Sequence, residues 1–227
     1  MTGAPESDRG GMTMEARNRV RLRFTKKGAA RFLSHHDLMR LFERAIRRAG
    51  LPVKMSQGFN PRPKFSIAAA LGVGVSAENE ILDVELHEPV DPAVVRKKLA
   101  QEAIPGIEIV DAGRAKRKSA RVVAGLYEVQ LPPDAELPEG AVDALLAQDE
   151  VIVERTTKKK SKRIDIRPCI LDIRRSGPMV RMRLQITDTG APRPEEVIGA
   201  LAEEPGFERN RLQIVRTDLE LAPDEQA

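Results

Sequence analysis

The sequence predicts an α+β protein made of two tandem ferredoxin-like, split βαβ domains, each built on an antiparallel sheet. The chain has 227 residues, which is more than one typical domain contains. Hydrophobic periodicity in the first half gives the order strand, helix, strand, strand, helix, strand, and the second half repeats this plan more weakly. Between the halves, residues 114–121 carry five Lys or Arg in eight positions and form the predicted linker. The predicted domains are therefore 18–113 and 122–221, with a disordered tail over 1–17 and a second tail over 222–227.

The first strand and helix are predicted from alternation and from capping residues. Apolar residues alternate with arginines over 19–25, which is typical of a half-buried strand whose arginines meet solvent or an anion. Ser34 and Asp37 then form a pair that resembles a capping box, with Asp in place of the usual Glu. Apolar side chains recur at helical spacing after this pair, and Gly50 ends the helix.

Small residues dominate the next strand. Residues 65–75 are apolar and end in a glycine-containing turn, so they predict a buried strand. Acidic turn residues should follow, and then a strand over 81–86. Asp91 or a neighbour should cap the second helix, because a proline stands in its first turn, and residues 107–112 should form the closing strand.

The second half contains the same kinds of pattern in weaker form. The predicted strands are 127–131, 151–154, 164–173, 179–186 and 212–221, and the predicted helices are 138–147 and 194–202.

Composition narrows the class of protein. The formal net charge is +4, so the clustering of charge matters more than its total. Tryptophan is absent and aromatic residues are 3%, which predicts a poor surface for stacking bases. Cys169 is the one cysteine, which excludes an intrachain disulfide and a Cys-rich zinc or three-cysteine iron–sulfur site, and we expect no disulfide-linked partner. No apolar run is long enough to span a membrane and no signal core is present, so we expect a cytoplasmic protein with no membrane partner.

A loop over 56–64 is the stretch around which we expect the chain to be organised. Gly58, Pro61 and Pro63 give this loop a defined shape, because glycine permits positive φ and proline fixes φ. The loop and its flank carry cations but no acid, which suits an anion or a phosphate. The alternative is a proline-rich connection that only positions the next strand. The predicted anion or RNA ligands in this stretch are Lys54, Ser56, Gln57, Asn60, Arg62 and Lys64.

Two further groups of cations could contact RNA phosphates. The outer face of the first helix is rich in arginine, and a basic run lies between two predicted strands of the second half, where a hairpin tip could reach a phosphate backbone. Solvation of the surface is the alternative for both groups, and an internal salt bridge with Asp165 is the alternative for Arg167. The predicted ligands are Arg40, Arg44, Arg47, Arg48, Lys158, Lys159, Lys160, Lys162, Arg163 and Arg167.

His35 and His36 are the candidate catalytic residues. Neighbouring positions on a helix point about 100° apart, so one ring could face the core and the other solvent. A histidine beside a cationic loop could serve as a general base in RNA cleavage. The alternative is that both rings only make hydrogen bonds, and the pair lacks metal-ligand spacing. We find no nucleotide-binding, nucleophile or metal motif, so the sequence does not support an enzyme acting alone and predicts no metal site.

Three motifs carry a resemblance to a known family. The runs FLSHHDL at 32–38, SQGFNPRPK at 56–64 and KKKSKRIDIRP at 158–168 resemble bacterial radical-SAM-linked proteins of unknown function, over residues 19–221. In that family the domain stands alone or is fused to the C-terminus of a cobalamin-binding radical SAM protein, and this chain looks like the stand-alone version. The resemblance implies such a protein as partner. It also implies that iron–sulfur cluster, S-adenosylmethionine and cobalamin belong to the partner, with no cofactor in this chain.

These observations lead to one functional hypothesis and two alternatives. We expect an accessory subunit that binds RNA and presents it to a radical SAM partner. One alternative is a metal-independent endoribonuclease of the CRISPR repeat-processing type, which shares a tandem ferredoxin-like fold and a basic loop. The other is a pure protein-interaction module for the radical SAM partner.

Overall fold

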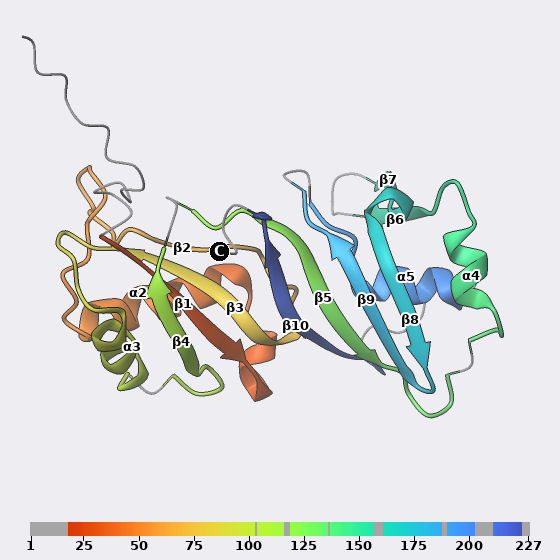
Figure 1. Cartoon of the computed structure of the whole chain (residues 1–227), viewed down its shortest axis with the longest axis horizontal. Coiled ribbons are helices and arrows are strands. Elements are labelled where there is room, and N and C mark those ends of the chain that lie inside the picture. The colour runs from red at the N-terminus through yellow and green to blue at the C-terminus, as the bar shows by residue number, and fades with distance from the viewer. Residues whose placement is uncertain are drawn as a thin grey trace, which may run out of the picture.

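The computed structural model describes residues 18–102, 104–115, 119–135, 137–156, 161–187, 190–202 and 211–223. These residues form a mixed α+β fold with one large, mostly antiparallel sheet and few helices (Figure 1). The elements of the first half are β1 (Arg19–Lys26), η1 (Gly28–Phe32), α2 (His35–Arg48), β2 (Phe65–Ile67), β3 (Ser76–Glu85), α3 (Pro92–Ala100) and β4 (Ile109–Arg114). Those of the second half are β5 (Val122–Gln130), α4 (Ala141–Leu146), β6 (Ile152–Thr156), β7 (Ser161–Asp165), η2 (Arg167–Cys169), β8 (Ile170–Ser176), β9 (Met179–Gln185), α5 (Pro194–Leu201) and β10 (Gln213–Leu221).

The large sheet is continuous across both halves of the chain. Its strands follow the order β4-β1-β3-β10-β5-β9-β8, and β2 pairs with β3 beside this path. Within each half all neighbouring strands are antiparallel. The halves join where β10 runs parallel to β3, with Val215 opposite Ser76 and Arg216 opposite Ala77. The last strand of the second half therefore lies in the middle of the sheet.

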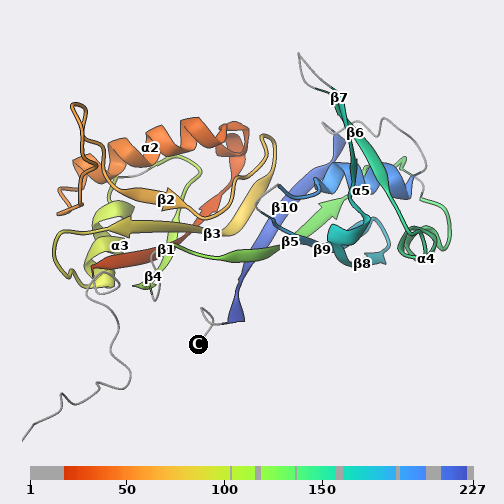
Figure 2. The same cartoon turned by 90° about the horizontal axis from the view of Figure 1, so that it is seen from above.

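Two main hydrophobic cores lie on the helical side of the sheet, one in the first half and one in the second, and the second also takes in Leu71, Val75 and Ala77 of the first half. Leu38 and Phe42 of α2 pack with Leu22 and Phe24 of β1, and the rings of Phe24 and Phe42 are 4.9 Å apart. In the second half, α5 packs against β5 and β9. Figure 2 shows α2 and α5 on the same side of the sheet, with an interval between them. None of the helices in the described ranges is long and apolar enough to cross a membrane.

The predicted start of the first helix is confirmed. Ser34 is the N-cap of α2, and its Oγ accepts a hydrogen bond from the backbone N–H of Asp37 at 3.2 Å. The same hydroxyl donates to the Asp37 carboxylate at 2.6 Å. The cap of the second helix is also confirmed, because the Asp91 carboxylate accepts from the N–H of Ala93 at 2.9 Å.

The prediction of a strand over 65–75 is wrong beyond Ile67. The carbonyl groups of Ala69 and Ala70 accept hydrogen bonds from the Arg216 guanidinium instead of continuing the ladder. The acidic turn predicted before residue 81 is also wrong, because β3 already begins at Ser76. Glu80 is part of this strand and is buried in an ion pair with Arg216, so its charge does not mark a turn.

The predicted strand over 164–173 is divided into two. β7 ends at Asp165, the short helix η2 contains Pro168, and β8 begins at Ile170. The Asp165 carboxylate accepts hydrogen bonds from the N–H groups of Val151 and Arg167, which fixes this turn. β6 and β7 consequently form a separate two-stranded hairpin.

The arginines of β1 pair with acids on β3 and β10. Arg19 contacts Glu85 at 2.7 Å, and Arg21 contacts Asp83 at 2.8 Å. Arg23 contacts Asp218 at 3.3 Å. These pairs lie on the face of the sheet that the helices do not cover. The row of arginines therefore holds strands together, and it is not simply solvated.

Residues 114–121 only partly form a connection. Arg114 belongs to β4, Ala115 is buried, and the N–H of Ala120 donates to the Asp83 carboxylate at 3.1 Å. The predicted tail over 1–17, the middle of the linker at 116–118 and most of the predicted tail over 222–227 lie outside the described residues.

Candidate nucleic-acid interface

The loop over 56–62 is closed by its own backbone. The N–H of Ser56 donates to the carbonyl of Arg62 at 2.7 Å, and the N–H of Arg62 donates to Ser56 Oγ at 2.9 Å. Gly58 at the tip has φ of 125°, a value that favours glycine. Phe59 follows, and its side chain is fully exposed. The loop is thus an ordered projection that presents a phenyl ring to solvent.

Helix α2 lies beside this loop (Figure 2) and contacts it through Arg47. Arg47 donates to the carbonyl of Pro61 at 3.1 Å and also contacts Glu43 at 3.2 Å. Arg44 and Arg62 are both exposed, and in the described part of the chain neither has an ion-pair partner. Their charges are therefore available to an anion that approaches the loop or the adjoining face of α2.

Other predicted ligands around the loop are less available. Arg48 contacts Glu102 at 2.6 Å, Lys54 contacts Glu85 at 2.8 Å, and Arg40 lies 3.9 Å from Asp37. Burial alone would raise the pKa of Glu85, but the hydrogen bond from Lys54 and the charge of Arg19 hold this pKa below its usual value. Gln57 and Asn60 are exposed in the loop, and Lys64 is half-buried beside it.

The basic run of the second half lies on a different projection. Lys162 and Arg163 are exposed on β7, whereas Lys158, Lys159 and Lys160 lie outside the described residues. The structure does not bring this hairpin next to the loop over 56–62, because the two project from opposite ends of the molecule (Figures 1 and 2).

Arg167 serves a structural purpose in this half. Its guanidinium donates to the carbonyl of Leu146 at 2.7 Å and to that of Ile170 at 3.3 Å. It therefore ties the end of α4 to the start of β8.

The two candidate catalytic histidines have different surroundings. The ring of His35 is half-buried, and its Nδ1 is buried with no hydrogen-bond partner among the described residues. Burial lowers the pKa of His35, and the charges of His36 and Lys26 lower it further. His36 is exposed, with its ring centroid 6.1 Å from that of His35. A neutral His35 could accept a proton, but its role in catalysis stays a hypothesis. Among the described residues no group of His, Cys, Asp and Glu side chains could hold a metal ion.

A buried polar cluster at the junction of the halves was not foreseen. Arg216 is 1% exposed and contacts the equally buried Glu80 through two hydrogen bonds of 2.7 and 2.5 Å. Burial alone would lower the pKa of Arg216, but the carboxylate of Glu80 raises it above its usual value. Lys26 lies nearby, with its Nζ donating to the carbonyl of Leu33 at 3.0 Å, and burial lowers the pKa of Lys26.

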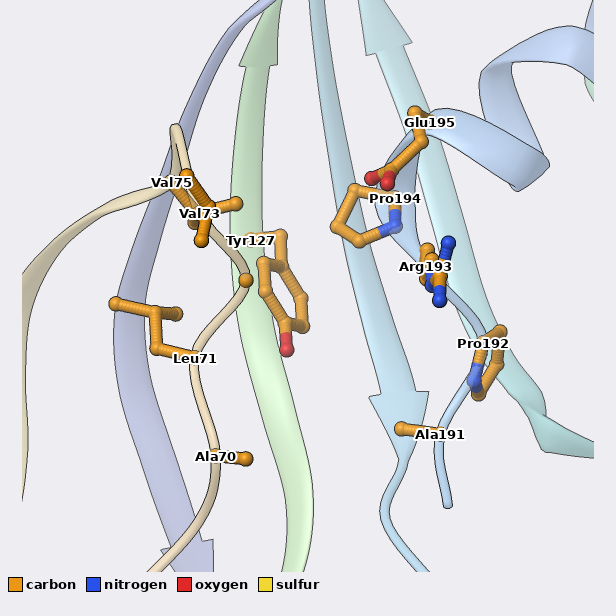
Figure 3. A pocket seen from close by; sticks show the side chains of 11 residues that line it. Ala70, Leu71, Val73, Val75, Tyr127, Ala191, Pro192, Arg193, Pro194 and Glu195 are labelled. Atoms are coloured by element: carbon orange, nitrogen blue, oxygen red, sulfur yellow. The ribbon is translucent and has the colours of Figure 1, made fainter. Parts of the chain in front are cut away.

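A pocket of about 380 Å³ opens beside this cluster (Figure 3). The segment 70–75 forms one wall, the segment 191–195 forms the other, and Tyr127 of β5 lies between them. The sequence gives no signal for this site, because Tyr127, the single tyrosine of the chain, stands in an ordinary strand pattern. Its contact with Arg216 joins residues far apart in the sequence, so periodicity could not reveal it.

The fold and these two sites define an α+β protein with a basic projecting loop and a pocket between its halves. The chain belongs to the bacterial family described as "Uncharacterized protein conserved in bacteria (DUF2344)", whose model matches residues 19–194. This confirms the expected membership of a bacterial family of unknown function.

Comparisons with other proteins add little to this assignment. No curated protein matches the chain. Among solved structures, it is similar to a chain in the crystal structure of a Cbf5-Nop10-Gar1 complex, with 11% identity and a TM-score of 0.44, over 94% of this chain and 52% of that one. This chain thus spans about half the length of that relative. It is also similar to the crystal structure of an unknown protein from Galdieria sulphuraria, with 19% identity and a TM-score of 0.28, over 90% of this chain and 98% of that one.

Proposed function

We propose that this protein is an accessory subunit that binds single-stranded RNA and presents it to a radical SAM partner. The observation that supports RNA binding best is the closed loop over 56–62. It displays the exposed ring of Phe59 together with exposed Arg62, and α2, which contacts the loop through Arg47, carries exposed Arg44. Among the described residues neither Arg44 nor Arg62 has an ion-pair partner. Proteins that bind single strands combine aromatic side chains, on which bases stack, with cations that follow the phosphates.

The architecture proposed for this function is two ferredoxin-like units, over 18–113 and 122–221. Support comes from the strand orders β4-β1-β3-β2 and β10-β5-β9-β8, each of which places the first and third strands of a unit at its centre. One hydrophobic cluster also lies within the first unit and another mainly within the second, although the latter takes in Leu71, Val75 and Ala77 of the first. In this proposal both units would contribute basic projections to one extended RNA surface.

The proposed partner is a cobalamin-binding radical SAM protein in the cytoplasm. Its support is the resemblance of the motifs at 32–38, 56–64 and 158–168 to radical-SAM-linked proteins. The iron–sulfur cluster, S-adenosylmethionine and cobalamin would belong to that partner. A single cysteine, Cys169, cannot hold a cluster, so purified chain should contain no stoichiometric iron and sulfide.

A salt series can separate phosphate contacts from base stacking. For single strands, log K falls with log salt at about −0.7 per neutralised phosphate. Arg44→Gln combined with Arg62→Gln should therefore make the slope shallower by about 1.4, if each contacts one phosphate. Phe59→Ala should weaken binding by about 1–3 kcal/mol and leave the slope unchanged, because a phenyl ring releases no counterion.

The matched control removes two arginines from the other face of the sheet. Arg174 and Arg181 are exposed there, paired with Asp172 and Glu128, and their joint replacement by Gln should leave affinity and slope close to wild type. Wild-type protein that shows no salt-dependent affinity for single-stranded RNA would reject the proposal.

The protein-interaction module is a second candidate because a fully exposed phenylalanine is also a suitable anchor for a protein partner. In that case the protein would bind the radical SAM partner but show no salt-dependent RNA binding, and Phe59→Ala would abolish partner binding. An endoribonuclease would cleave labelled RNA without metal and lose this activity in His35→Ala. The half-buried ring of His35, whose pKa is lowered by burial, supports this candidate.

A further inference from the structure

We propose that the pocket between the halves receives one nucleotide of the bound RNA, with its base against Tyr127. This inference rests on the proposed RNA binding and names the part of the RNA that is presented. The pocket volume of about 380 Å³ lies at the lower end of the range for small-molecule sites, about 300–1,000 Å³. It therefore suits a single nucleotide and excludes a duplex or a peptide helix.

Tyr127 is held in one position as the floor of this pocket. Its side chain is 6% exposed, and Arg216 Nη1 lies 3.4 Å from its hydroxyl group. Gly125, two residues earlier on β5, leaves room for the ring, because a Cβ atom there would lie 2.9 Å from Tyr127 Cε2. The ring cannot swing away without disturbing its neighbours, so the small part of it that borders the pocket is a fixed point of contact for a base.

Two arginines fix the pocket walls. Arg216 donates to the carbonyls of Ala69 at 3.2 Å and Ala70 at 3.1 Å, and so holds the first wall. Arg155 of β6 donates to the carbonyl of Ala191 at 2.8 Å and to the Glu196 carboxylate at 2.7 Å, and so holds the second. A site held in this way needs little ordering when a ligand enters, which favours affinity.

The lining suits a nucleotide in chemistry as well as in size. Leu71, Val75 and Pro194 give it apolar sides that can contact the faces of a base. Arg193 stands at the rim with an exposed side chain that can meet a phosphate. In Figure 3 the carboxylate of Glu195 faces the space beside Tyr127, where it can accept hydrogen bonds from N–H groups of a base.

The position of the pocket agrees with a strand that crosses the molecule. Figure 2 shows α2 at one end of the sheet and the β6–β7 hairpin at the other, both on the side where the pocket walls lie. Arg44 and Arg62 belong to the first end, and Lys162 and Arg163 to the second. A backbone that contacts both ends passes the pocket, so one base can turn into it.

The chain offers a direct spectroscopic test, because it has one tyrosine and no tryptophan. All tyrosine fluorescence therefore comes from Tyr127. The full-length protein is titrated with short homopolymeric oligoribonucleotides, and binding is followed in parallel by the anisotropy of a dye on the RNA. We expect saturable quenching of Tyr127 with the same midpoint as the anisotropy. An oligomer with the same sugar–phosphate backbone but no bases should bind with the same salt slope and should not quench.

Variants at the pocket mouth complete the test. Val73 is an exposed part of one wall, so the Val73→Glu variant should fold normally, and its carboxylate should repel phosphate. We expect this variant to lose the quenching and to bind RNA about fivefold or more weakly, which is the lower end of the contribution of base stacking. Arg193→Gln should also reduce quenching, but to a smaller extent than Val73→Glu. Arg174→Gln, on the face of the sheet away from the pocket, should behave as wild type.

The outcomes distinguish this inference from the function on which it rests. If RNA binds with a salt-dependent affinity but Tyr127 fluorescence does not change, the pocket assignment is wrong and RNA binding survives. If no RNA binds, both are wrong.

Discussion

Replacing Glu80 by Gln should destabilise the protein by about 3–5 kcal/mol, the usual cost of removing one partner from a buried ion pair. The side chains of Glu80 and Arg216 are 1% and 2% exposed, so water cannot solvate the Arg216 guanidinium after its counter-charge is removed. Gln can still accept from Arg216 Nε, but its amide nitrogen cannot accept from Nη2. The guanidinium would keep only neutral partners, namely the new amide oxygen, two backbone carbonyls and the Tyr127 hydroxyl.

Urea unfolding measures this cost, with a control that β10 itself provides. Glu220 contacts Arg183 through bidentate hydrogen bonds of 2.8 and 2.7 Å, but the two side chains are 27% and 44% exposed. Glu220→Gln makes the same chemical change in a pair that water can reach, and it should lower the free energy of unfolding by no more than about 1 kcal/mol. With an m value of about 2 kcal/mol/M, Glu80→Gln should lower the midpoint by about 2 M. Circular dichroism and Tyr127 fluorescence should report the same transition.

Equal costs for the two substitutions would refute the reasoning, because the argument depends on burial alone. A change in the m value would also count against the reasoning. It would mean that the substitution changes the surface exposed on unfolding, so that the drop in stability does not come from the ion pair alone.

Three further predictions concern single positions. Burial and neighbouring charges lower the pKa of His35, so as pH falls the unfolded chain binds a proton at this residue before the folded protein does. The wild type should therefore lose stability relative to His35→Gln as pH falls through 6.5, as measured by urea unfolding at several pH values. Gly106 has φ of 76°, and a Cβ atom there would lie 2.5 Å from the carbonyl oxygen of Lys27. Gly140 has a similar φ of 73° but open space around it, so Gly106→Ala should lower the melting temperature more than Gly140→Ala does. Equal shifts would contradict this prediction. Ser34→Ala removes the N-cap of α2 and should cost about 1 kcal/mol in chemical denaturation, and an unchanged midpoint would show that the cap contributes nothing.

Local patterns in the sequence predicted the elements whose stability is local. The alternation before Thr25 and the caps at Ser34 and Asp91 act within a few residues, so β1, α2 and α3 could be placed. The failures involve partners distant in the chain. The charge of Glu80 indicated a turn, because nothing near it in the sequence shows that Arg216 neutralises it from the other half.

The candidate site divides in the same way. The loop could be recognised because a glycine, two prolines and two cations lie within the nine residues 56–64. Low aromatic content predicted a poor stacking surface, yet Phe59 is displayed at the tip and Tyr127 lies in the pocket. A count of aromatic residues cannot show where the few that exist are exposed. The pocket itself needs segments more than a hundred residues apart, which only the sheet order brings together.

The position of β10 has a consequence for synthesis on the ribosome. This strand fills the centre of the large sheet, yet of the strands described here it is the last to leave the exit tunnel. Until it emerges, the nascent chain carries one unpaired edge on β3 and another on β5, and Glu80 lacks its counter-charge. The halves can therefore begin to form separately, but they can become one sheet only after residues 213–221 are complete. Ribosome-bound chains that stop short of β10 should bind chaperones more strongly than chains that include it.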